Sequence, residues 1–177
     1  MTIAGRRDTV DAINRKHMDA LTTPEQVYEG HIEGKFSEDS LPTERELVLK
    51  VGAQVVFIKN DMEKRWVNGT LGKVEECQDD YVQVRTEDGT LHRVEPNIWS
   101  NVRYEYNEEK KAVEEIVLGT YTQLPLKAAW ALTVHKSQGL TFSRINIDLG
   151  AGAFAGGQTY VALSRCRSLE GIKLLSP

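Results

Sequence analysis

The strongest constraint on the fold of this 177-residue chain is a change of sequence pattern between its middle and its two ends. From Glu46 to about Leu124, short β-branched runs alternate with turn residues. Before and after this segment, strand-like runs alternate with helix-like runs. Strands that alternate with helices predict a parallel sheet with crossover connections, whereas short strands joined by tight turns predict an antiparallel barrel. The sequence therefore predicts one α/β domain that is interrupted by a small antiparallel barrel.

The middle segment shows its turns clearly. Asn68-Gly69 lies where a tight turn is expected, between GAQVVFIKND and the run that ends in KVEEC. Glu87-Asp88-Gly89 separates YVQVRT from TLHRVE in the same way, and the charged NEEKK separates NIWSNVRYEY from AVEEIVLGTY. We expect five or six short strands here.

The two ends predict the α/β part. TIAG predicts a strand, and residues 8–21 predict an amphipathic helix that Asp8 caps. Residues 22–45 hold prolines, glycines and acidic residues with weak periodicity, so we expect a connecting loop. After Pro125, KAAWALT, RINIDL and IKLL predict strands, while VHKSQG and GGQTYVALSRC predict helices.

The run TVHKSQGLTF at residues 133–142 is polar although apolar AAWAL precedes it. It would lie where a central strand turns into a helix, and parallel sheets bind ligands at the carboxyl ends of their strands. Helix N-termini also attract anions. The polar side chains here suit a phosphate; they are Thr133, His135, Lys136, Ser137 and Gln138. The open alternative is that Thr133 and Ser137 only cap a helix and that the others are solvated.

Charge is unevenly distributed along the chain. The net charge is −4, yet residues 126–177 hold six Lys/Arg and only two Asp/Glu. Within this basic segment, Arg165 and Arg167 lie at the end of the second predicted helix. They are either partners of the helix dipole or groups that stabilise charge during phosphoryl transfer.

Several classes of protein and site do not fit the sequence. It has no apolar run of membrane-spanning length and no signal peptide. Cys77 and Cys166 have no CxxC partner, so we expect no zinc site and a reducing, cytoplasmic setting. A single disulfide between them is the alternative. The Walker phosphate-loop pattern is absent, because Gly34-Lys35 and Gly72-Lys73 lack the flanking residues that it needs. An apolar strand ending in a magnesium-binding Asp-Glu pair is missing too.

TVHKSQGLTF followed by YVALSRCRSLEGI resembles motifs five and six of superfamily 1 helicases, in particular the Pif and RecD group, which translocates five-prime to three-prime on single-stranded DNA. DTVDAIN resembles the helix that begins the second RecA-like domain of these enzymes, and GAQVVFIKND and WVNGTLGKV resemble the Src-homology-type barrel inserted in it. The resemblance covers the chain from Thr2 to its end. It implies a RecA-like domain of the P-loop NTPase type at residues 1–45 and 125–177, and a barrel at 46–124.

The resemblance also implies roles for individual residues. Arg165 matches the arginine finger that reaches the γ-phosphate, and Gln138 and Gly139 match positions beside the nucleotide. The positions that grip the DNA backbone are matched by Thr133, His135, Lys136 and Ser137. Barrel aromatic residues either stack on bases or pack in the core; they are Trp66, Trp99, Tyr104 and Tyr106.

Taken together, the resemblance and the missing motifs imply the C-terminal part of an ATP-dependent DNA helicase. ATP and Mg2+ would then be held with the protein's own N-terminal RecA-like domain, and this fragment alone would bind no cofactor and be inactive. The expected partners are single-stranded DNA or a forked duplex, and not a membrane. A free-standing nucleic-acid-binding module without a motor, or a structural remnant of a helicase, stays open as an alternative.

Overall fold

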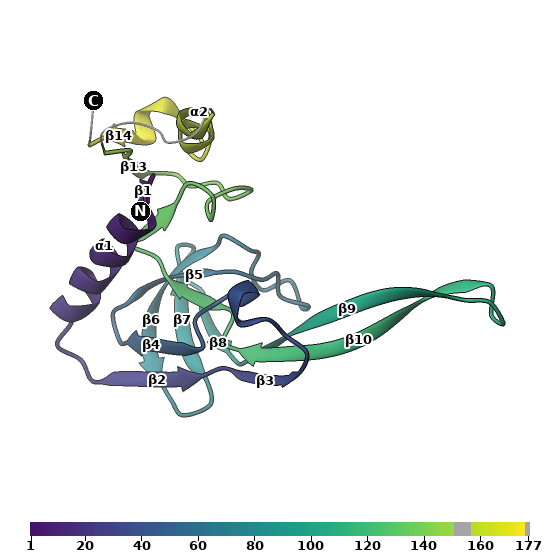
Figure 1. Ribbon diagram of the computed structural model, residues 1–177. Helices are drawn as coiled ribbons and strands as arrows, with labels where there is room; N and C mark the ends of the chain where they lie inside the picture. The colour runs from purple at the N-terminus through teal and green to yellow at the C-terminus, as the bar shows by residue number, and fades with distance from the viewer. Residues whose placement is uncertain (151–156, 176–177) are drawn as a thin grey trace.

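The computed structural model describes residues 1–150 and 157–175, and it has two parts (Figure 1). The first part is a parallel sheet with strand order β12-β1-β13-β14. Its strands are β1 (Thr2–Ala4), β12 (Ala131–Thr133), β13 (Ile145–Asp148) and β14 (Ile172–Leu174). The parallel sheet of an α/β fold is therefore confirmed. The predicted strand KAAWALT is divided in two: Lys127 and Ala128 belong to β11 (Leu126–Ala128) of the antiparallel part, and after a bend at Trp130 only Ala131–Thr133 join the parallel sheet as β12.

Two helices cover opposite faces of this sheet. α1 (Arg7–Ala20) packs Val10 against Ala4 and Ala131. α2 (Gln158–Leu163) packs Ala162 in the core that contains Ile3, and neighbouring residues of a strand point to opposite faces. In the described ranges, neither helix is long and apolar enough to cross a membrane.

The N-terminus of α1 differs from the sequence prediction. Arg6 is the N-cap residue, and its side chain makes no capping hydrogen bond. Asp8, predicted to be the cap, lies in the first turn, where its carboxylate accepts the N–H of Thr9. The helix is instead held by Asn14, whose side-chain amide donates to the carbonyl of Ala131 (3.0 Å) and accepts its N–H (2.8 Å). Asn14 thus makes the two hydrogen bonds to Ala131 that a neighbouring strand would otherwise make to the edge strand β12.

The second part is antiparallel and encloses its own core. A five-stranded sheet has the order β11-β5-β6-β7-β8. Its members are β5 (Gln54–Phe57), β6 (Leu71–Cys77), β7 (Val82–Thr86), β8 (Leu91–Val94) and β11 (Leu126–Ala128). The predicted turns are confirmed: Gly69 and Gly89 adopt φ of 95° and 85°, which glycine tolerates best.

β5 joins the two parts of the molecule. Val55 and Phe57 are fully buried in the core of the antiparallel part, while Val56, which points the other way, is buried against the parallel sheet. A strand buried on both faces fixes one part against the other without a separate linker.

Residues 22–45, predicted to be a connecting loop, instead contain two strands and a short 3-10 helix. β2 (Glu25–Glu29) pairs with β4 (Glu46–Lys50), and β3 (His31–Gly34) pairs with β10 (Ala112–Gln123). The 3-10 helix is Glu38–Ser40. The prediction was wrong because these strands gain their stability from partners far along the chain.

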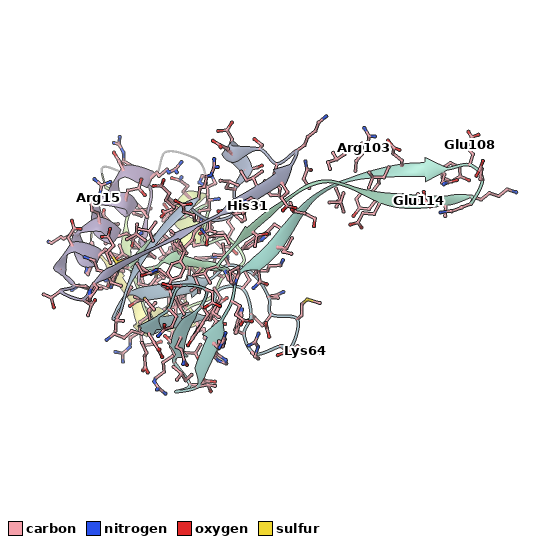
Figure 2. The ribbon with its side chains drawn as sticks, turned by 90° about the horizontal axis from the view of Figure 1, so that it is seen from below. Arg15, His31, Lys64, Arg103, Glu108 and Glu114 are labelled. Atoms are coloured by element: carbon pink, nitrogen blue, oxygen red, sulfur yellow. The ribbon has the colours of Figure 1, made fainter. Side chains whose placement is uncertain are left out.

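The last two strands predicted for the middle segment, NIWSNVRYEY and AVEEIVLGTY, are longer than predicted and form an arm. β9 (Asn97–Asn107) and β10 (Ala112–Gln123) pair along their length, with β3 alongside their base. Beyond that base the hairpin projects far from the body of the molecule (Figure 1). Figure 2 shows Arg103, Glu108 and Glu114 on this arm, remote from the rest of the chain.

Candidate nucleic-acid and nucleotide site

The candidate site begins where β1 and β12 end at the same edge of the parallel sheet. Ala4 and Thr133 are register partners, and the N–H of Val134 continues the pairing by donating to the carbonyl of Ala4 (3.1 Å). Residues that follow these two strands therefore lie side by side, as the sequence predicted for the carboxyl edge of a parallel sheet.

Residues 134–139 form successive turns rather than the predicted short helix. The N–H of Ser137 donates to the carbonyls of Thr133 (3.0 Å) and Val134 (3.2 Å), and that of Gln138 to His135 (3.3 Å). Gly139 then adopts a φ of 78°, which ends any helical continuation. Because there is no helix, anion binding here does not draw on a helix dipole. The exposed side chains of the turn remain as the groups that could bind the predicted anion.

The turn separates its side chains into outward and inward groups. His135 and Lys136 are exposed, and within the described residues their charged or polar ends have no hydrogen-bond or ion-pair partner. Ser137 is fully buried, and its hydroxyl donates to the carbonyl of Val134 (2.7 Å). The Thr133 hydroxyl oxygen accepts the N–H of Lys136 (3.2 Å). Thr133 and Ser137 thus shape the turn, and His135 and Lys136 face solvent.

Arg165 connects this turn to the end of α2. Its guanidinium donates from Nε to the carbonyl of Val161 (3.0 Å) and from Nη1 to the carbonyls of Leu140 (3.2 Å) and Ser137 (3.4 Å). Nη2 donates to the hydroxyl of Ser164 (2.9 Å). The structure therefore brings Arg165 together with the predicted nucleotide-side residues Gln138 and Gly139, which are exposed in the same turn.

Sequence reasoning missed a lysine at this edge. Lys127 of β11 is largely buried, and its pKa is lowered by burial and by the neighbouring Lys136, with a smaller contribution from Arg7; Glu44 opposes the shift. No hydrogen-bond partner for its amine is present among the described residues. The three cations come from β11, α1 and the turn, so only the folded chain brings them together. Burial and the neighbouring positive charge disfavour the protonated amine, and an anion bound beside it would offset both effects.

The four aromatic residues predicted for the barrel differ in their exposure. Trp66 is only 4% exposed and stacks on Phe57 in the core, with 4.5 Å between the ring centroids. Trp99 is half-buried, with Lys59 over its ring. Tyr104 and Tyr106 are 65% and 63% exposed on the arm. In residues 1–150 and 157–175, no group of three or more His, Cys, Asp or Glu is arranged to hold a metal ion.

Comparison with known proteins gives one consistent result. No family model matches the chain. The ATP-dependent DNA helicase Pif1 of Bdellovibrio bacteriovorus is 37% identical over 154 residues, which cover 85% of this chain and 32% of that protein. The ATP-dependent DNA helicase PIF1 of Danio rerio is 36% identical over 177 residues, covering 96% of this chain and 26% of that protein. The chain thus spans about a third or less of these relatives.

Solved structures of Bacteroides Pif1 match nearly the whole chain. The unliganded protein and its ADP-AlF4 complex each superpose with a TM-score of 0.91, at 39% identity, over 99% of this chain and 40% of that one. The same protein bound to single-stranded DNA gives 0.77 at the same identity and coverage. Sequence and fold agree over the same residues, and the chain therefore belongs to the Pif1 family of DNA helicases, of whose members it spans a part.

Proposed function

We propose that this chain is the part of an ATP-dependent DNA helicase that grips single-stranded DNA and supplies an arginine finger. The observation that carries the proposal is the direct hydrogen bonding of Arg165 to the turn that exposes His135 and Lys136. Arg165, which is suited to nucleotide chemistry, is therefore bonded directly to the edge of the sheet that we propose faces phosphate. The relatives named as ATP-dependent DNA helicases, and the neighbours solved with single-stranded DNA or ADP-AlF4, support the same assignment.

For the architecture we propose a RecA-like half interrupted by a barrel of the Src-homology type. The boundaries implied by the sequence are 1–45 and 125–177 for the RecA-like half and 46–124 for the barrel. The pairing of β2 with β4 and of β11 with β5 supports moving them, to about residue 22 and about residue 129. Both strand pairs contribute to one apolar core.

For DNA binding we propose that His135 and Lys136 contact the phosphate backbone, with Lys127 and Arg7 adding to the positive potential of the same edge. Thr133 and Ser137 act by holding the turn, since the hydroxyl of Ser137 is buried and already donates to the protein. Phosphate contacts of this kind provide affinity without reading base sequence.

For the nucleotide we propose that Arg165 leaves its carbonyl acceptors for the γ-phosphate, since an anionic oxygen is a stronger acceptor than a neutral carbonyl. When Arg165 releases the carbonyls of Leu140 and Ser137, the turn would loosen and its grip on DNA would change. This change would couple ATP hydrolysis to movement along the strand. Gln138 and Gly139 lie beside Arg165. We propose that Mg2+ and most contacts to ATP belong to another RecA-like domain of the same protein, as the resemblance to helicase motifs five and six implies.

The partners that fit this assignment are single-stranded DNA, a forked duplex and that second domain. A reducing, cytoplasmic compartment is also part of the proposal, and it is supported by the two cysteines, Cys77 and Cys166, which are both free.

Lys136→Ala and Lys127→Met are each expected to weaken binding of labelled oligo(dT) to the chain. A plot of the logarithm of the association constant K against log salt concentration has a negative slope, and each lost phosphate contact should make it less steep by about 0.7. Fluorescence anisotropy over a salt series measures this slope. Lys16→Ala removes an exposed charge from α1 and should leave the slope unchanged. Slopes that stay at the wild-type value in both variants would contradict the proposed grip.

The stability of a Lys127 variant shows whether the Lys127 amine serves DNA binding or only the fold. Because its pKa is lowered from 10.5 in the folded chain, the unfolded chain binds the proton more tightly, and stability rises with pH through the lowered value towards 10.5. Lys127→Met should therefore unfold at higher urea than the wild type at neutral pH, and this advantage should narrow in the alkaline range. A variant that is less stable and binds DNA normally would show that the amine has only a structural role.

A further inference from the structure

A second basic region lies at the opposite, amino edge of the parallel sheet. A cleft of about 1160 Å³ separates this edge from the antiparallel sheet. Met1, Trp130 and Arg144, which immediately precede β1, β12 and β13, all line it. The lining also includes Gly139 and Thr141, at and just after the end of the turn that carries His135 and Lys136, so the cleft extends from beside that turn to the amino edge of the sheet.

The cleft is more positive than the chain as a whole. Its lining includes three anionic side chains and six cationic ones, although the net charge of the chain is −4. Two of the cations are neutralised, since Arg65 pairs with Asp61 (2.9 Å) and Arg85 pairs with Glu75. The other four are exposed and form no ion pair or side-chain hydrogen bond in the part of the chain that the structure describes; they are Lys64, Lys73, Arg144 and Arg167.

These four cations come from both walls. Arg144 and Arg167 belong to the parallel side, where the bridge between Phe142 and Cys166 holds their two segments together and the N–H of Arg167 donates to the carbonyl of Phe142 (3.0 Å). Lys73 lies on β6 of the opposite wall. Cations on two facing walls suit a ligand that carries several phosphates better than a single anion.

Lys64 is held in place by its loop. The Asp61 carboxylate accepts the N–H groups of Glu63 and Arg65 (both 3.1 Å), and the Arg65 guanidinium lies 4.5 Å from the Trp66 ring centroid. Lys64 itself adopts a φ of 60°, a conformation uncommon for a residue other than glycine. Figure 2 shows Lys64 on a loop that extends from the body. The loop thus fixes the direction of an unpaired cation at the rim of the cleft.

We propose that this cleft binds the phosphate backbone of a second stretch of nucleic-acid strand, apart from the stretch held at His135 and Lys136. The inference rests on the proposed function, which supplies the polyanion. The stretch is either a continuation of the bound strand or the other strand of a fork, because both present the same phosphodiester chemistry. Trp130, half-buried in the lining, adds an aromatic surface beside the cations.

Paired substitutions test each wall separately. The variants are Arg144→Gln with Arg167→Gln, and Lys64→Asn with Lys73→Gln, where asparagine tolerates the left-handed backbone of position 64. Arg15→Gln with Lys16→Gln, on the exposed face of α1, is the matched control. Binding of a labelled oligo(dT) of about six nucleotides, a long oligo(dT) and a fork would be measured over a salt series by anisotropy, with circular dichroism to check folding.

On the long strand or on the fork, each cleft variant should reduce the slope of log K against log salt concentration by about 1.4, twice the value for one contact to single-stranded DNA. The number of short oligonucleotides bound per chain should fall from two to one. A reduction on the long single strand identifies a continuation of the bound strand, and one confined to the fork identifies the other strand. Unchanged slopes on both ligands would overturn the proposal, as would tighter binding of an acidic peptide than of DNA. If the Lys136 and Lys127 variants keep the wild-type slope while the cleft variants reduce it, the result would count against the proposed function and not against DNA binding by the cleft.

Discussion

Arg165→Ala should lower ATP turnover by about a thousandfold or more, the usual effect of removing an arginine finger. The measurement uses a chimaera in which this chain replaces the matched 40% of Bacteroides Pif1. The guanidinium is needed for charge that develops in the transition state, so kcat should fall while binding of a fluorescent ATP analogue persists. Alanine also removes the hydrogen bonds to Leu140 and Ser137, so the salt dependence of DNA binding should change in the same variant.

Arg165→Lys is the informative control. An ammonium keeps the charge and loses the planar fork that reaches several carbonyls at once. We expect this variant to remain strongly impaired in turnover and in its response to DNA. Turnover within a few-fold of the wild-type chimaera in both variants would remove the finger assignment, whatever the effect on DNA binding.

Tyr121→Ala should destabilise the chain by about 3–5 kcal/mol, the usual cost of truncating a buried aromatic residue. Tyr121 is fully buried, and its hydroxyl donates to the carbonyls of Glu44 (3.1 Å) and Thr43 (3.3 Å). Its ring fills space that Gly30 leaves open, since a Cβ on Gly30 would lie only 2.4 Å from the tyrosine oxygen. Urea unfolding measures the loss.

Two variants calibrate this result. Tyr121→Phe keeps the ring and should cost about 1 kcal/mol for the lost hydrogen bonds. Tyr106→Ala, 63% exposed on the arm, should change stability by less than about 0.5 kcal/mol. A similar small effect for Tyr121→Ala and Tyr106→Ala would show that Tyr121 does not hold β10 to the rest of the antiparallel part.

Local signals predicted much of the fold. The hairpins around Gly69 and Gly89 and the helix α1 follow from turn residues and spacing within short windows. The strands in residues 22–45 do not, because their partners are distant. The side-chain amide of Gln123 donates to the carbonyls of Tyr28 and Arg45, and β3 pairs with the base of the arm. No window of the sequence contains both members of these pairs.

The candidate site was predictable in part for the same reason. The residue pattern located the polar run and Arg165, the resemblance supplied their expected roles, and the structure gives the run an exposed His135 and Lys136. The resemblance could not indicate that Ser137 is buried, because its burial depends on the geometry of the turn after β12. The excess of Lys and Arg in residues 126–177, with Arg167 among them, was visible in the sequence. That Lys127 lies beside Lys136 and Arg7, and that Arg144 and Arg167 line one cleft with Lys64 and Lys73, was not, because segments that are distant in the chain bring these cations together.

The most direct test of the central claim is DNA-stimulated ATP hydrolysis by the wild-type chimaera, compared with the 177-residue chain alone. Our account predicts that the chimaera hydrolyses ATP and that single-stranded DNA increases the rate, while the chain alone shows no turnover above background. A folded chimaera that binds ATP and DNA but does not hydrolyse ATP, or turnover by the chain alone at the rate of the chimaera, would contradict it.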